Sequence, residues 1–167
     1  MNITVMNRRD AIRACYHIHE RPTVIISISD PNMIYTSAPF TSKISNITAI
    51  LPLSFADADR PGLDVYGRDA DVSNLMSDED ANRVVTFVNL HKHADLIVHC
   101  DAGISRSAGV AAGIMKYVNG DDSQIFDSGR YRPNMWCYRK VLTAFMNMKG
   151  EEHGRYPCIH FAERRSG

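Results

Sequence analysis

The fold is decided by Leu96-Ile97-Val98-His99-Cys100-Asp101-Ala102-Gly103-Ile104-Ser105-Arg106-Ser107-Ala108-Gly109. The apolar run 96–98 predicts a short strand, and the small and apolar residues of 108–118 predict a helix. A strand, a tight loop and a helix N-terminus together form an anion site, because the loop N–H groups converge and the helix dipole adds positive potential. We therefore expect residues 99–107 to bind an anion.

Two side chains give this anion site its chemistry. Arg106 offers a planar fork of donors that suits two phosphate oxygens. Cys100 lies where the positive potential is focused, and such a setting favours the thiolate. A thiolate beneath a bound phosphate is a nucleophile directed at phosphorus.

The run His99-Cys100, five further residues and Arg106-Ser107 resembles the His-Cys-x5-Arg-Ser/Thr signature of the cysteine-dependent protein tyrosine phosphatases. The longer run from His99 to Ala108 is most similar to the dual-specificity branch, and the chain resembles its small bacterial and phage-type members. The resemblance implies a phosphate loop that binds the substrate, made of Asp101, Ala102, Gly103, Ile104, Ser105 and Arg106. It also implies that His99 supports the loop and tunes the cysteine; a buried structural histidine is the alternative.

Composition limits the classes of protein that fit. The chain has 167 residues, of which 44% are hydrophobic and 23% charged, and this suits one soluble domain. Lys and Arg together number 19, and Asp and Glu together also number 19, so the chain has no excess of basic residues. A nucleic-acid or membrane partner is therefore not expected. We expect a single phosphatase domain over residues 1–150 and a charged tail over 151–167. The four widely spaced cysteines indicate a reduced, cytoplasmic setting.

Predicted strands and helices alternate along the chain, which indicates an α/β domain with a mostly parallel sheet. Strands are predicted at 3–5, 23–28, 47–51 (stopped by Pro52) and 96–98. Helices are predicted after Asn7, after Ser77, from 108 and from 133 to Gly150. Residues 30–46 and 54–76 are predicted as loops. We expect a three-layer α/β/α fold with four to five strands, and the resemblance implies the strand order 1-4-2-3.

A phosphatase also needs a proton donor for the leaving oxygen, and a carboxylic acid is the usual one. Asp57 follows the third predicted strand and so reaches the edge of the sheet where the phosphate loop lies. The resemblance to bacterial phosphatases with Phe-x-Asp after this strand favours Asp57. Asp59 and Asp64 are the alternatives, and any of the three could instead be a solvated loop carboxylate.

Three other residues are open to more than one interpretation. The Ser107 hydroxyl either donates to the cysteine sulfur or caps the helix. Asn134 follows a proline, as in many dual-specificity phosphatases, and either braces the phosphate loop or caps the last helix. Asp101 places a carboxylate beside the nucleophile, and we expect its side chain to turn outward. No metal site and no cofactor is predicted, since no histidine pair or His–Cys group shows a four-ligand pattern.

The sequence therefore predicts a cysteine-dependent phosphoric monoester hydrolase that acts on phosphotyrosine and, in a dual-specificity enzyme, also on phosphoserine and phosphothreonine. Its partners would be phosphorylated proteins or peptides, together with phosphate and other oxyanions in the loop. One alternative is a phosphate-recognising binding module with little turnover. The other is a phosphatase for a non-protein phosphate ester, although such relatives tend to carry lysines in the loop and residues 101–105 contain none.

Overall fold

The computed structural model describes residues 1–31, 33, 46–64 and 67–154. Its main sheet has four parallel strands, which are β1 (Ile3–Asn7), β2 (Thr23–Ser29), β3 (Ile47–Ser54) and β6 (Asp95–Cys100). Their order across the sheet is β1-β6-β2-β3. Since β6 is the fourth strand of this sheet along the chain, the predicted order 1-4-2-3 is confirmed.

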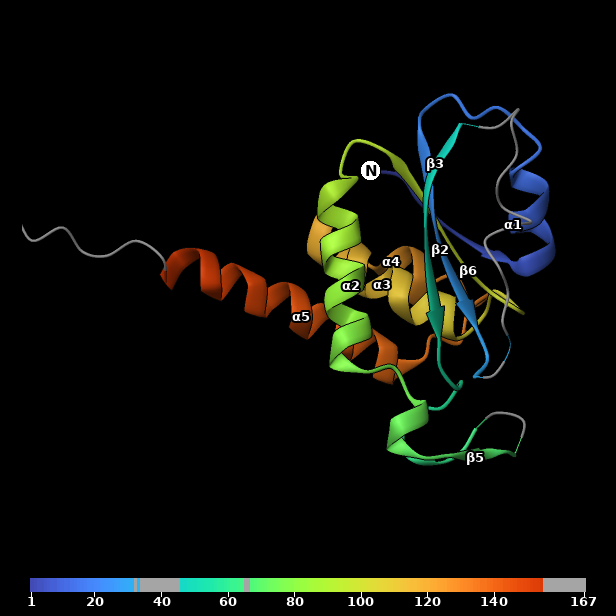
Figure 1. The fold of residues 1–167 in the computed structure, drawn as a ribbon, viewed down its shortest axis with the longest axis vertical. Helices are drawn as coiled ribbons and strands as arrows, with labels where there is room; N and C mark the ends of the chain where they lie inside the picture. The colour runs from blue at the N-terminus through green and yellow to red at the C-terminus, as the bar shows by residue number, and fades with distance from the viewer. Residues whose placement is uncertain (32, 34–45, 65–66, 155–167) are drawn as a thin grey trace, which may run out of the picture.

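Helices cover both faces of the sheet, as Figure 1 shows. Helices α2 (Asp78–Leu90), α3 (Arg106–Asn119) and α5 (Met135–Gly154) lie on one face, with the short α4 (Ser123–Phe126) beside them. Helix α1 (Arg8–Ala14) lies on the other face. The three-layer α/β/α fold is therefore confirmed.

The sheet carries a hydrophobic core on each face. Val24, Ile26 and Ile28 of β2 join the larger core with α2, α3 and α5. Ile25 points the other way and packs with Ala11 and Cys15 in a smaller core beneath α1. Successive strand side chains point to opposite faces, so a central parallel strand must be apolar at almost every position.

Local signals in the sequence fix several helix ends. The Ser77 hydroxyl accepts from the N–H of Asp80, whose carboxylate accepts from the N–H of Ser77, and this capping box begins α2. The Asn7 side chain accepts from the N–H of Asp10 at the start of α1. Gly120 ends α3 with φ 74°, a left-handed conformation that favours glycine.

Two predicted boundaries are wrong. Strand β3 passes through Pro52 to Ser54, because β3 is an edge strand and the missing N–H of a proline breaks no ladder there. Helix α5 continues past Gly150 to Gly154, since one glycine in a helix costs only about 1 kcal/mol relative to alanine. The division into a domain at 1–150 and a tail at 151–167 stays a prediction, and residues 155–167 lie outside the described residues.

The structure describes most of the predicted loop at 54–76 but little of the predicted loop at 30–46. The predicted loop at 54–76 contains a small antiparallel hairpin of β4 (Gly62–Leu63) and β5 (Asp69–Ala70), followed by the 3-10 helix η2 (Val72–Asn74). The hairpin lies beyond the carboxyl end of β3 (Figure 1). Most of the predicted loop at 30–46 lies outside the described residues.

Helix α3 packs closely against the start of α5 at Gly109. A Cβ atom at this position would collide with the backbone carbonyl oxygen of Asn134. Gly109→Ala is therefore expected to lower the free energy of unfolding by about 1–3 kcal/mol through overpacking, although alanine is the better helix former. Urea denaturation measures this change.

Gly113→Ala is the matched control on the same helix. Its Cβ would lie 3.0 Å from the Cβ of Val141 and 3.1 Å from the Tyr138 carbonyl oxygen, which is less close than the contact at Gly109, so a smaller loss is expected. A Gly109→Ala variant as stable as the wild type would contradict the close approach of α3 and Asn134.

Candidate active site

Cys100 ends β6 and is 2% exposed. Its Sγ lies 3.1 Å from the Ser107 hydroxyl and accepts from the backbone N–H of Gly103 at 3.3 Å. Ser107 lies inside α3, and Ser105 occupies the N-cap position. Of the two interpretations of Ser107, the structure therefore supports contact with sulfur and not a helix cap.

The backbone of the phosphate loop turns its carbonyl groups outward. The carbonyls of Asp101, Ile104 and Ser105 accept from the N–H groups of residues 8, 132 and 134 respectively. In a trans peptide the next N–H points opposite to the carbonyl, and the described residues contain no cis peptide. The N–H groups of residues 102, 105 and 106 are therefore directed to the inner side of the loop, where an anion would lie.

Glycine is required at one position of this loop. Gly103 has φ 68°, and a Cβ there would collide with the backbone of Met6 and Asn7. The loop thus packs directly on the end of β1, which pairs with β6 so that Asn7 lies opposite Cys100. Only a residue without a Cβ both adopts this conformation readily and permits this contact.

The Arg106 guanidinium is 1% exposed and is fixed on one side. Its Nη1 donates to the Phe55 carbonyl at 2.8 Å and lies 2.7 Å from an Asp30 carboxylate oxygen. Its Nε is buried and donates to no group of the described residues. The Nε and Nη2 edge therefore remains for two oxygens of a bound anion, the bidentate geometry that the sequence predicts.

Of the three candidate acids, Asp57 is joined to the loop. Its Oδ1 accepts from the Ser105 hydroxyl at 2.6 Å, and its Oδ2 lies 3.8 Å from Arg106 Nε. Asp59 instead accepts from the N–H of Met135 at the start of α5. Asp64 pairs with Arg68 at 2.6 Å in the hairpin.

Asn134 performs both of the tasks that the sequence left open. Its Nδ2 donates to Asp57 Oδ1 at 3.0 Å, and its backbone N–H donates to the Ser105 carbonyl at 3.1 Å. Its Oδ1 accepts from the N–H of Cys137, which caps α5. The residue thus joins the last helix, the candidate acid and the phosphate loop.

Asp101 departs from its predicted outward orientation. Its carboxylate is 31% exposed and lies 2.6 Å from Arg8 Nε and 3.6 Å from Arg106 Nη2. The side chain is held because Arg8 directly follows β1 at the same edge of the sheet.

His99 is fully buried beneath the loop, and its Nδ1 lies 3.5 Å from the Cys100 carbonyl. Burial and, secondarily, the charge of Arg8 lower its pKa from 6.5 to about 4. The ring is therefore neutral at physiological pH. This placement fits a supporting residue of the loop.

Sequence reasoning missed Arg8, Asp30 and the Phe55 carbonyl. Each comes directly after a strand, at the end of β1, β2 or β3 respectively. The carboxyl ends of parallel strands meet at one edge, and this rule could have pointed to all three positions.

The other described cysteines, Cys15 and Cys137, lie in the hydrophobic cores. Burial raises the pKa of the Cys137 thiol well above 9.0 and also raises that of Cys15, so both remain protonated. Cys158 lies outside the described residues. Within the described residues, His, Cys, Asp and Glu side chains form no group of three that could hold a metal ion. Among the described helices none is long and apolar enough to cross a membrane.

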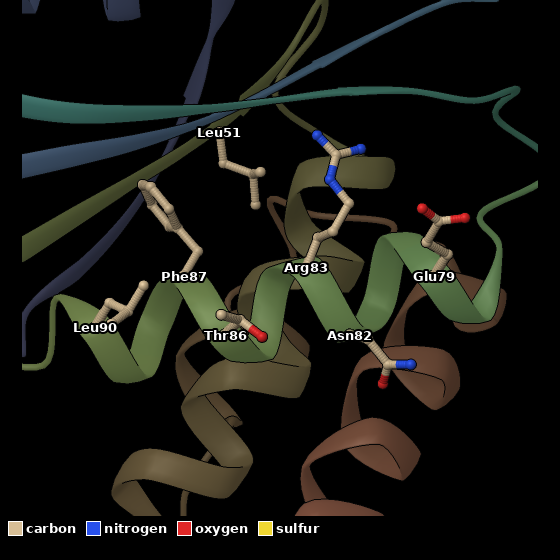
Figure 2. Close-up of a pocket in the computed structure, with 7 residues that line it drawn as sticks. All are labelled: Leu51, Glu79, Asn82, Arg83, Thr86, Phe87 and Leu90. Carbon is tan, nitrogen blue, oxygen red and sulfur yellow. The ribbon is translucent and has the colours of Figure 1, made fainter.

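A separate groove of about 500 Å³ lies between β3 and α2. Figure 2 shows Leu51, Phe87 and Leu90 along it, with Arg83 reaching toward the strand. Arg83 donates to the Pro52 carbonyl at 2.9 Å. No phosphate-loop residue lines this groove, so it is not part of the candidate active site.

No protein-family model matches the chain, and no curated protein is similar to it in sequence. Among solved structures, the fold is similar to the crystal structure of PTPMT1 in complex with PI(5)P. The TM-score is 0.54 and the identity 12%, over 90% of this chain and 94% of that one. Human DUSP28 has a TM-score of 0.47 and 14% identity, over 89% and 94% of the two chains. A mouse putative dual specificity phosphatase complexed with zinc tungstate has a TM-score of 0.48 and 14% identity, over 90% of this chain and 86% of that one.

The chain has the three-layer cysteine-phosphatase fold, as the signature around Cys100 and Arg106 predicted. The likeness to PTPMT1 spans nearly all of both chains, so it concerns the whole fold and not the signature loop alone.

The low pKa of His99 makes stability depend on pH. Below about pH 6.5 an unfolded histidine binds a proton that the folded chain excludes. Stability is therefore lost as the pH falls from 6.5 to about 4, by about 3 kcal/mol in total. His99→Gln should remove this contribution, which urea unfolding at about pH 7.5 and about pH 4.5 measures.

His17→Gln is the control, because His17 is exposed. It should keep the pH dependence of the wild type. An equal loss of stability on acidification in the wild type and in His99→Gln would show that His99 titrates alike in both states.

Proposed function

We propose that this protein is a cysteine-dependent phosphatase that hydrolyses phosphate monoesters through a cysteinyl-phosphate intermediate. The observation that carries the proposal is the meeting of Cys100, Arg106 and Asp57 at one loop. The phosphatase fold supports it. The activity needs a reduced Cys100, so a reducing compartment such as the cytoplasm belongs to the proposal.

In the first step the Cys100 thiolate attacks phosphorus. The S–P bond forms, the bond from phosphorus to the ester oxygen breaks, and that oxygen takes a proton from Asp57. Arg106 Nε and Nη2 and the inward N–H groups of residues 102, 105 and 106 stabilise the charge on the equatorial oxygens. Asp57 Oδ1 accepts two hydrogen bonds, so Oδ2 is the oxygen that carries the proton.

In the second step water attacks the phosphorus of the intermediate and gives a proton to Asp57. The S–P bond breaks and the sulfur leaves as a thiolate. The Ser107 hydroxyl, 3.1 Å from Sγ, donates to it as its charge develops. No metal or organic cofactor takes part in the proposed reaction.

We propose phosphorylated protein side chains as the substrate. PTPMT1 was crystallised with PI(5)P, so a phosphoinositide is the alternative ester to compare. Residues 101–105 contain one aspartate and no lysine, so the loop side chains offer no positive charge to an additional phosphate. Phosphotyrosine, phosphoserine and phosphothreonine peptides should therefore be turned over faster than PI(5)P.

Replacement of the nucleophile tests the mechanism. Cys100→Ser should lower kcat on an aryl phosphate by more than about a hundredfold, because loss of a nucleophile should exceed the share of a general acid. Binding of inorganic phosphate should persist, since the loop N–H groups and Arg106 remain.

Cys15→Ala is the matched control, because Cys15 is buried beneath α1 in the smaller core. It should retain turnover. A Cys100→Ser variant with more than about a hundredth of the wild-type kcat would contradict the covalent mechanism. A wild-type protein that binds phosphate but does not turn over aryl phosphates would instead be a binding module.

Replacement of the acid tests the role of Asp57. Asp57→Asn should lower kcat on phosphotyrosine by about 10²–10³-fold. The loss should be much smaller with an activated aryl phosphate, whose leaving group hardly needs a proton. The basic limb of the kcat/KM profile against pH should flatten, because it reports loss of the proton from the acid.

Asp59→Asn and Asp64→Asn are the controls. Neither should show this dependence on the leaving group, because Asp59 caps α5 and Asp64 pairs with Arg68. If either shows it and Asp57→Asn does not, the acid is misassigned.

A further inference from the structure

Asp101 presents an electrostatic problem for an anion-binding loop. It directly follows the nucleophile, and its Oδ2 lies 3.6 Å from Arg106 Nη2. In the proposed function that nitrogen binds a phosphate oxygen. A carboxylate there repels the phosphate and competes with it for the same donor.

Arg8 holds this carboxylate from the opposite side. Its Nε donates to Asp101 Oδ1 at 2.6 Å, and its Nη2 donates to the Ile28 carbonyl at 3.1 Å. The Arg8 side chain is only 14% exposed. The guanidinium is therefore held between the end of β2 and the loop, and it lies closer to the Asp101 carboxylate than Arg106 does.

Arg8 also contacts the loop through its backbone. Its N–H donates to the Asp101 carbonyl at 3.2 Å, and this directs the next N–H inward. Substitution of the side chain leaves that backbone contact possible. The effect of the side-chain pair can thus be measured separately from the orientation of the loop peptide.

The position of Arg8 in α1 does not itself explain the burial of its side chain. Arg8 lies in the first turn, where the helix dipole is unfavourable for a cation. Its neighbour Arg9 is 75% exposed and lies 3.8 Å from Asp10. The two residues differ in their contacts, and those of Arg8 include the phosphate loop and the end of β2.

We propose that Arg8 is a positioning residue, which sets the affinity of the phosphate loop by holding the Asp101 carboxylate away from the bound phosphate. The inference rests on the proposed function, because it concerns the anion that this loop binds. With Arg8 in place, Arg106 Nη2 is available to the substrate. Without Arg8, the Asp101 carboxylate turns to Arg106 and opposes the phosphate.

A double-mutant cycle tests the proposal on the full chain. The dissociation constant of orthovanadate, and KM and kcat on an aryl phosphate, are measured for the wild type, Arg8→Ala, Asp101→Asn and the double variant. Arg8→Ala should weaken vanadate binding about tenfold and raise KM more than it lowers kcat. Asp101→Asn should tighten vanadate binding. The double variant should return to within about threefold of Asp101→Asn, since no carboxylate remains for Arg8 to hold.

Arg9→Ala is the matched control and should bind vanadate as the wild type does. A double variant as weak as Arg8→Ala would overturn the proposal, because Arg8 would then act on the fold or on the anion itself. So would an Arg8→Ala variant that folds and binds vanadate as tightly as the wild type. If Arg8→Ala does not fold, Asp101→Asn alone decides: tighter vanadate binding supports the proposal, and unchanged or weaker binding overturns it.

The same measurements separate this inference from the proposed function. A wild-type protein that neither binds vanadate nor hydrolyses aryl phosphates would contradict the proposed function itself. A wild type that does both, with additive effects of Arg8→Ala and Asp101→Asn, would contradict only the role of Arg8.

Discussion

The buried guanidinium of Arg106 is the constraint on which the site depends. A buried charge is tolerated only when it is paired and hydrogen-bonded, and here the Phe55 carbonyl and Asp30 both engage Nη1. Asp30 also pairs with Arg68 at 2.9 Å, and Arg68 pairs with Asp64. A chain of alternating charges thus connects the hairpin to the phosphate loop. It fixes one side of Arg106 and leaves the other directed toward an anion.

The topology of the sheet brings these groups together. All four strands of the main sheet are parallel, so their carboxyl ends meet at one edge. Each end supplies part of the site: Arg8 follows β1, Asp30 follows β2, Phe55 and Asp57 follow β3, and Cys100 ends β6. Residues separated by up to 92 positions therefore meet at one place.

The sequence predicts those elements and site residues whose positions depend on neighbouring residues in the chain. The β-branched run of β2 and the capping box at Ser77 identify their elements by periodicity and hydrogen-bonding capacity. Cys100 and Arg106 could be placed because a strand, a loop and a helix follow one another in the chain. Pro52 misled the prediction, because its effect depends on whether the strand lies at an edge of the sheet.

The pairs that span strand ends could not be deduced in the same way. The contacts of Asp101 with Arg8 and of Arg106 with Asp30 depend on strand order and register, which the local pattern does not contain. Similarly, the loop from 54 to 76 carries several aspartates, and their separate roles follow only from what each one contacts. Asp57 reaches Ser105, whereas Asp64 is paired with Arg68.

We propose that the phosphate loop holds a phosphoryl group between Cys100 and the Nε and Nη2 edge of Arg106. A crystal structure of the wild-type protein with orthovanadate tests it most directly. We expect vanadium bonded to Cys100 Sγ, with two equatorial oxygens on Arg106 Nε and Nη2 and with Nη1 still on Asp30 and the Phe55 carbonyl. Vanadate bound away from Cys100, or an Arg106 that leaves Asp30 and contacts vanadate through Nη1, would contradict this arrangement of the site.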